Sequence, residues 1–122
     1  MTKHLRFLIV LLMTLVWSTG GAAEKTETIN IKDYVPSSGY VQIPQNKPLN
    51  QNGFKIYIED KSTNGNPGLY KRDSNLRFYT DDILHIESSN GDITSVEFTG
   101  TVSIIGLTSN TWSGTPSASV SF

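Results

Sequence analysis

The residues of this chain that could do acid–base or nucleophilic chemistry are few. His85 is the one histidine after residue 23, and Asp81, Asp82 and Asp92 lie near it in the sequence. Neighbouring residues of a strand point to opposite faces, so Asp81 and Asp82 do not form a general acid–base pair. No serine or cysteine nucleophile motif accompanies His85. We therefore predict no catalytic residues and interpret the aspartates as strand-end charges that discourage aggregation.

A second candidate for chemistry is the polar segment D-K-S-T-N-G, which begins at Asp60. It partly matches the start of a calcium-binding loop, with Asp60, Ser62 and Asn64 as oxygen ligands at alternate positions. The last ligand of such a loop is a bidentate glutamate, but Lys71 stands at that position. The alternative is a polar loop whose side chains bond their own backbone. We favour this alternative, so we predict no metal and no cofactor.

Aromatic side chains are the best candidates for ligand binding. Strand alternation places Tyr57, Arg77 and Tyr79 away from the core, while Tyr70 and Trp112 lie in or beside loops. Aromatic rings beside hydrogen-bonding groups stack on sugar rings, and they also anchor protein interfaces. The alternatives are cross-strand packing on a sheet face and, for Trp112, burial in the core. These five residues are our candidate ligand-binding set.

The elements that must position these residues are predicted to be strands. Alternating apolar residues between turn signals predict seven strands: Thr28–Lys32, Phe54–Asp60, Leu76–Thr80, Asp82–Ser88, Ile93–Gly100, Thr101–Leu107 and Ala118–Phe122. The segments between residues 33 and 53 and between 61 and 75 read as loops. We expect an all-β fold, a single antiparallel β-sandwich of jelly-roll or immunoglobulin-like type, with a small β-barrel as the alternative.

Asn90-Gly91 lies between two of these strands and is a strong β-hairpin signal. A two-residue loop would mix the buried faces of the two strands. We therefore predict an odd-length loop with Gly91 in the left-handed region, which brings Leu84 and Ile86 to the face of Val96 and Phe98. In that register His85 points outward, opposite Ser95 or Glu97.

The first 23 residues have the pattern of a secretory signal peptide. Lys3, His4 and Arg6 give a positive start, FLIVLLMTLVW is an apolar core, and a run of small residues ends at Ala23. We predict a signal-peptide helix at residues 1–23, cleavage after Ala23, and one domain at residues 24–122. An uncleaved membrane anchor is the alternative, but the apolar core is shorter than the roughly 20 residues that span a bilayer.

The net charge of the predicted domain argues against some classes of binding partner. Removing Lys3 and Arg6 leaves eight basic against eleven acidic residues, a formal charge of −3, and the chain has no cysteine. A mildly acidic domain without a basic run argues against nucleic acid and against anionic membrane surfaces as partners. We predict an exported protein that is periplasmic, on the cell surface or secreted, with no stable membrane insertion after cleavage.

The C-terminal half resembles a known kind of module. The runs NPGLYKRDSNLRFYTDDILHIESSNGDITSVEFTG and TWSGTPSASVSF resemble uncharacterised β-sandwich modules in secreted and surface proteins of gut anaerobic bacteria. The resemblance covers roughly residues 54–122. The matching positions are Pro67, Tyr70, Arg77, Tyr79, Ile93, Val96, Phe98, Trp112, Gly114, Val120 and Phe122. Against these modules, the segment before Trp112 is shorter and the chain stops where one more strand is expected.

These observations favour an exported, non-catalytic binding or adhesion module whose ligand is a polysaccharide or a surface protein. The alternative is an assembly protein that pairs through an open sheet edge, with Ala118–Phe122 as the edge of a homo-oligomer. A small secreted hydrolase is the third reading.

Overall fold

The computed structural model describes residues 7–10, 12–18, 24–63, 65–100 and 110–122, and these form an all-β fold. The strands are β1 Phe7–Val10, β2 Leu12–Ser18, β3 Lys25–Asn30, β4 Tyr40–Val41, β5 Leu49–Gln51, β6 Phe54–Glu59, β7 Gly68–Tyr70, β8 Asn75–Tyr79, β9 Ile83–Ser88, β10 Asp92–Thr99, β11 Thr111–Ser117 and β12 Ser119–Ser121. One short 3-10 turn, η1 at Ile31–Asp33, follows β3.

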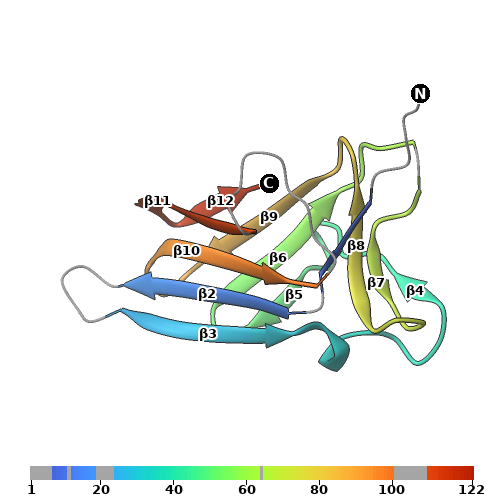
Figure 1. The fold of residues 1–122 in the computed structure, drawn as a ribbon, viewed down its shortest axis with the longest axis horizontal. Helices are drawn as coiled ribbons and strands as arrows, with labels where there is room; N and C mark the ends of the chain where they lie inside the picture. Colours follow the sequence, from blue (N-terminus) through green and yellow to red (C-terminus); the bar gives the residue numbers. More distant parts are fainter. Residues whose placement is uncertain (1–6, 11, 19–23, 64, 101–109) are drawn as a thin grey trace.

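The strands form three antiparallel sheets around one core. Sheet A has the order β1-β8-β7-β4, sheet B has β11-β10-β2-β3, and sheet C has β12-β9-β6-β5. Figure 1 shows sheet B in front of sheet C, with sheet A at one end. This antiparallel all-β architecture confirms the predicted fold class.

The core consists of the alternate residues that face inward from the sheets. The predicted inward sets of β6, β9 and β10 are all buried: Phe54, Ile56, Ile58, Leu84, Ile86, Val96 and Phe98. Val120 is buried as well, and Phe122 packs against the core from the end of the chain. Burial of these faces stabilises the fold, because each fully buried side chain of this size contributes about 1.5–3 kcal/mol.

The predicted hairpin at Asn90-Gly91 is wrong. β9 belongs to sheet C and β10 to sheet B, so the connection crosses from one layer to the other. Gly91 has a φ of +156°, far from the left-handed value near +57°. The two apolar faces are opposed across the core, which buries both without requiring the strands to share a face.

The segment with the signal-peptide pattern is not helical where the structure describes it. β1 pairs with β8, and β2 lies between β10 and β3. Met13, Leu15 and Trp17 are buried and alternate with half-buried residues. This alternation suits the pleat of a strand, which buries every second side chain and pairs the backbone on both sides.

The remaining boundary predictions vary in outcome. Strands were correctly predicted at the positions of β6, β8, β9 and β10. Three further strands lie in segments that were predicted to be loops or turns: Leu49–Gln51, Gly68–Tyr70 and Thr111–Ser117. The strand predicted at residues 101–107 lies outside the described residues. β12 is an outer strand of sheet C, so Ser119–Ser121 form a sheet edge within the part of the chain that the structure describes.

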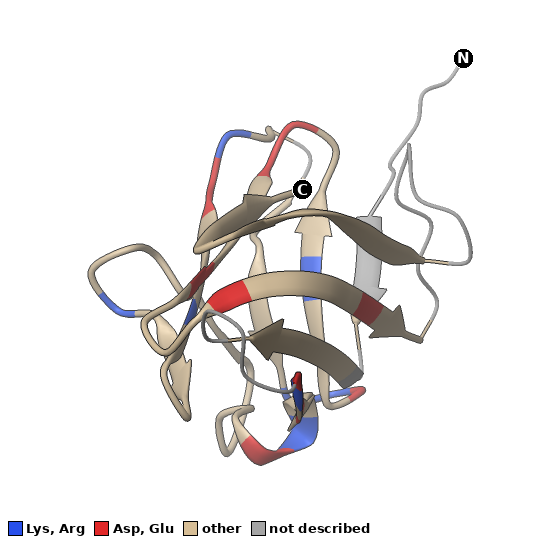
Figure 2. Cartoon of the chain, turned by 90° about the vertical axis from the view of Figure 1, so that its left-hand side faces the viewer, with Lys and Arg blue, Asp and Glu red and all other residues tan. Residues whose placement is uncertain are grey.

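Charged residues are distributed in short, separated segments. Figure 2 shows Lys and Arg interspersed with Asp and Glu in loops and strands.

Candidate functional site

Three strands of sheet A bring two tyrosines and an arginine together on the outer surface. Tyr40 of β4 pairs with Tyr70 of β7, and their rings stack with centroids 4.9 Å apart and planes inclined by 13°. Arg77 of β8 places its guanidinium carbon 4.4 Å from the centroid of the Tyr70 ring. We call Tyr40, Tyr70 and Arg77 the tyrosine–arginine surface. Tyr40 is its exposed end, with 44% of its surface accessible.

The tyrosine–arginine surface is held in place by polar contacts on both sides. Arg77 Nη2 lies 2.9 Å from the Asp73 carboxylate, and its Nε donates to Asn75 at 3.2 Å. The Tyr70 hydroxyl donates to the carbonyl of Asn66. Burial, followed by a hydrogen bond with the Tyr79 side chain, raises the pKa of Tyr70 to about 12. Tyr70 therefore stays a neutral donor throughout the physiological pH range.

Tyr79 lies beside this surface but is buried, with 9% of its area accessible. A Cβ atom on Gly65 would lie 2.5 Å from the Tyr79 ring, so this glycine lets the loop lie directly on the ring. Tyr79 is outside the main core cluster, which agrees with its predicted direction away from the core. Its neighbours cover it, however, so its ring is not exposed at the surface.

Tyr57 lies on the outer face of sheet C, separate from the tyrosine–arginine surface. Only 5% of it is accessible, because its ring stacks on His85 with centroids 4.7 Å apart. Its hydroxyl donates to Glu87 Oε2 at 2.6 Å, and this bond, with burial, raises the pKa of Tyr57 to about 12. Tyr57 is outside the main core cluster, which agrees with its predicted direction away from the core, but a cross-strand partner covers its ring. This is the packing alternative considered for it.

Trp112 of β11 belongs to neither group. It is half-buried, packs against the core, and meets Phe122 edge-on at a centroid distance of 6.5 Å. A Cβ on Gly114 would lie 3.2 Å from its indole ring. These contacts pack the Trp112 ring against the core.

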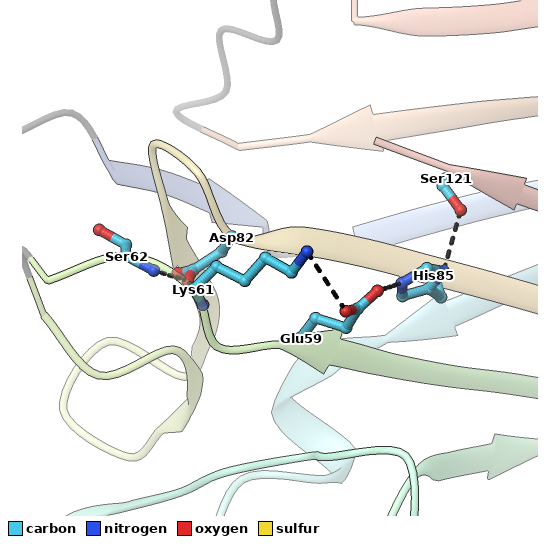
Figure 3. A network of polar contacts seen from close by, with 6 residues as sticks. All are labelled: Glu59, Lys61, Ser62, Asp82, His85 and Ser121. Atoms are coloured by element: carbon cyan, nitrogen blue, oxygen red, sulfur yellow. Dashed lines mark hydrogen bonds and ion pairs between the residues drawn. The ribbon is translucent and has the colours of Figure 1, made fainter.

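The outer face of sheet C carries a Ser–His–carboxylate row (Figure 3). Ser121 Oγ lies 2.9 Å from His85 Nδ1, and His85 Nε2 bonds to Glu59. Since an ionised carboxylate only accepts, His85 Nε2 is the donor in the bond to Glu59. The hydrogen bond from His85 lowers the pKa of Glu59. The predicted neighbours of His85, Ser95 or Glu97, were wrong because β9 pairs with β6 and β12 instead of β10.

This row contains the three kinds of group that a serine hydrolase uses. Hydrolysis requires donors aimed at a developing oxyanion and a site that excludes water. One surface pocket is lined by residues 50–55 and 87–89, and another by residues 42–45, 58–61 and 67. Glu59 of the row lines the second of these pockets, whereas Ser121 and His85 line neither. The contacts of the row therefore tie together three adjacent strands of sheet C.

The loop read as a partial calcium site is held by a carboxylate from a neighbouring turn (Figure 3). Asp82 Oδ1 accepts the backbone N–H groups of Lys61 at 2.9 Å and Ser62 at 2.8 Å, and its Oδ2 accepts that of Tyr79 at 2.8 Å. Asp60 accepts from Gln42 at 3.2 Å. The interpretation of Asp82 as a strand-end charge that discourages aggregation was wrong, because only 6% of it is accessible and it binds backbone N–H groups.

Metal ligands do not gather in the described part of the chain. There, no three His, Cys, Asp or Glu residues are placed so that they could hold an ion together, and Asn64 lies outside the described residues. In the same part of the chain, no helix has the length and apolar character needed to cross a membrane.

Comparisons with protein-family models, with curated proteins and with solved structures find no match to this chain.

Proposed function

We propose that this protein is an exported, non-catalytic binding module that holds a polysaccharide on its tyrosine–arginine surface. The observation that carries this proposal is the exposed Tyr40 ring, which is stacked on Tyr70 and thereby fixed in orientation. A fixed ring loses little conformational freedom when a ligand stacks on it, and this lowers the entropic cost of binding.

The chemistry around Tyr40 suits a sugar. The accessible face of an aromatic ring packs against the C–H face of a pyranose, and neighbouring polar groups bond its hydroxyls. Asp73 offers a carboxylate whose side chain is 56% exposed, and Arg77 of the interior strand β8 offers N–H groups beside it. These acceptor and donor groups lie beside Tyr70, the ring on which Tyr40 stacks, and they match the mixed hydroxyl pattern of a carbohydrate.

Export is the second part of the proposal. The positive start, the apolar run and the small residues before Glu24 support secretion through a signal peptide, with release into the periplasm, the cell surface or the exterior.

Affinity electrophoresis tests this function. The protein, purified after export from a bacterial host, is run through gels containing neutral plant, acidic and mucin-type polysaccharides. We expect one polymer class to slow its migration. Unchanged migration in every gel would reject the polysaccharide and direct the search to a protein ligand.

A further inference from the structure

The strand β2 occupies an interior position in sheet B, although it belongs to the segment with the signal-peptide pattern. It pairs with β10 from Asp92↔Ser18 to Thr99↔Leu12, and with β3 from Trp17↔Lys25 to Leu12↔Asn30. Figure 1 shows it between these two strands. Cleavage after Ala23 would therefore remove a strand from the middle of a sheet, and β1 from the edge of sheet A.

The removed residues fill a large part of the core. Val10, Met13 and Leu15 are 0% accessible, and Trp17 is 7% accessible with its ring edge-on to Phe54 at 4.8 Å. Without them, the apolar faces of β10 and β3 are opened to solvent, along with Phe54. Those faces carry Ile93, Val96, Phe98 and Ile29, all buried in the structure.

The gap does not close simply by moving β3 onto β10. β3 is tied to the neighbouring sheet, since Gln51 Nε2 donates to the Thr28 carbonyl at 3.0 Å and Asn52 Nδ2 donates to Glu27 at 2.7 Å. The turn η1 that follows β3 buries Ile31, which is 0% accessible. Closure would require β3 to move by about 4.8 Å, one strand spacing, and so break these contacts.

We propose that the processed domain accepts an extended strand from a second exported protein in the gap between β10 and β3. The proposal rests on one part of the proposed function, cleavage after Ala23. That cleavage also removes β1, the neighbour of the Arg77 strand β8, but the peptide measurements below do not use polysaccharide binding. β2 itself defines the required ligand: a strand of about seven residues, antiparallel to both neighbours, with large apolar side chains at alternate positions like Met13, Leu15 and Trp17. Strand addition of this kind supplies backbone hydrogen bonds on both sides and a buried apolar face.

The first step of the test is the mass of the protein isolated from an exporting host. We expect the mass of residues 24–122. A mass that includes residues 7–18 would overturn the inference and the cleavage step, while leaving the tyrosine–arginine surface to be tested separately.

In the second step, a peptide is added to the processed protein. The peptide has the sequence of residues 12–18, with lysines at both ends. The control peptide has the same composition with its apolar residues shifted by one position, which turns them to the wrong face. We expect the first peptide to raise Tm by about 10 °C at roughly 100 times its Kd, and the shifted peptide to leave Tm unchanged. Equal effects of the two peptides, or no effect of either on a folded monomer, would overturn the inference.

A third measurement applies if residues 24–122 do not fold without a strand in the gap. The full chain, expressed without export and carrying a protease site in place of residues 19–23, is cut after folding. We expect the N-terminal fragment to stay bound in gel filtration and to be displaced by the in-phase peptide but not by the shifted one. Loss of the fragment, with the remaining domain still folded and monomeric, would overturn the inference.

Discussion

At the scale of single residues, the side chains that matter most are those that satisfy the backbone of a neighbouring segment. Asp82 accepts three backbone N–H groups from two segments and is nearly inaccessible. Asp81, next to it, is exposed and has a φ of +85°. The sequence presents these two as equivalent acidic residues, because alternation alone does not show which of them meets the loop.

Asp82→Asn tests this difference. The amide places a donor against one of the N–H groups, so we expect the free energy of unfolding to fall by about 1–3 kcal/mol. The control is Asp81→Asn, because asparagine tolerates a positive φ and the residue is exposed. Urea unfolding of both variants measures the effect. Equal stability of the two variants would show that the Asp82 contacts contribute nothing.

Tyr57 gives a prediction in alkaline solution. Its pKa of about 12 lies above the usual value of 10.0, so the folded state holds the phenolic proton more tightly than the unfolded state. The stability that Tyr57 contributes is therefore present below pH 10 and is lost as the pH rises toward 12.

We expect Tyr57→Phe to cost about 1.5 kcal/mol at neutral pH, because the hydrogen bond to the Glu87 carboxylate is lost. Between pH 10 and 12 its Tm should fall less steeply than that of the wild type. The remaining slope in both proteins includes Tyr70, whose pKa is also raised to about 12. Parallel slopes of Tm against pH would contradict the assignment.

At the scale of elements, the alternation of apolar residues correctly located β6, β8, β9 and β10 but not their partners. Alternation shows which face of a strand is buried, and two opposed layers bury such faces as well as a hairpin does. β7 was missed because it is three residues long, and β11 because Gly114 and Pro116 are typical of turns. The candidate site was predicted in part for the same reason. Tyr70, Arg77 and Tyr79 lie close together in the structure, but Tyr40 was not selected because its segment was predicted to be a loop.

The close approach of β4 and β7 depends on Gly68. It has a φ of +151°, and a Cβ at this position would lie 2.2 Å from the Val41 carbonyl oxygen. We expect Gly68→Ala to cost about 2–4 kcal/mol and to separate Tyr40 from Tyr70. Gly39→Ala is the matched control. Its φ is +66° but no atom lies within 4 Å, so only about 1–2 kcal/mol of backbone strain is expected. Thermal unfolding ranks the two variants, and a larger loss at Gly39 would contradict the packing described for β7.

At the scale of the whole molecule, the N-terminal apolar segment has two interpretations, a signal peptide and a pair of core strands. Residues 7–18 are apolar enough to be the core of a signal peptide, and they alternate well enough to fill a sheet. The sequence favoured the signal peptide because its charged start and small-residue end are local features. The strand pairing depends on β10 and β3, which no local pattern identifies.

The contribution of this segment to the uncleaved chain is measurable. In the full chain expressed without export, we expect Leu15→Ala to cost about 2–5 kcal/mol, since Leu15 is 0% accessible. Val16→Ala, at the half-buried neighbouring position, should cost much less. Denaturant unfolding of the two variants gives the comparison, and similar small losses would place β2 outside the core.

The central claim is that the Tyr40 ring is the contact point for a polysaccharide, and a pair of neighbouring substitutions tests it most directly. Tyr40→Ala and Val41→Ala both shorten an exposed side chain on β4, but only the first removes the ring of the tyrosine–arginine surface. The Kd of each variant for the polymer that retards the wild type is measured by affinity electrophoresis. We expect Tyr40→Ala to weaken binding at least about tenfold, a loss of about 1.4 kcal/mol, with Val41→Ala unchanged. Equal Kd values for wild type and Tyr40→Ala would contradict the assignment of this surface.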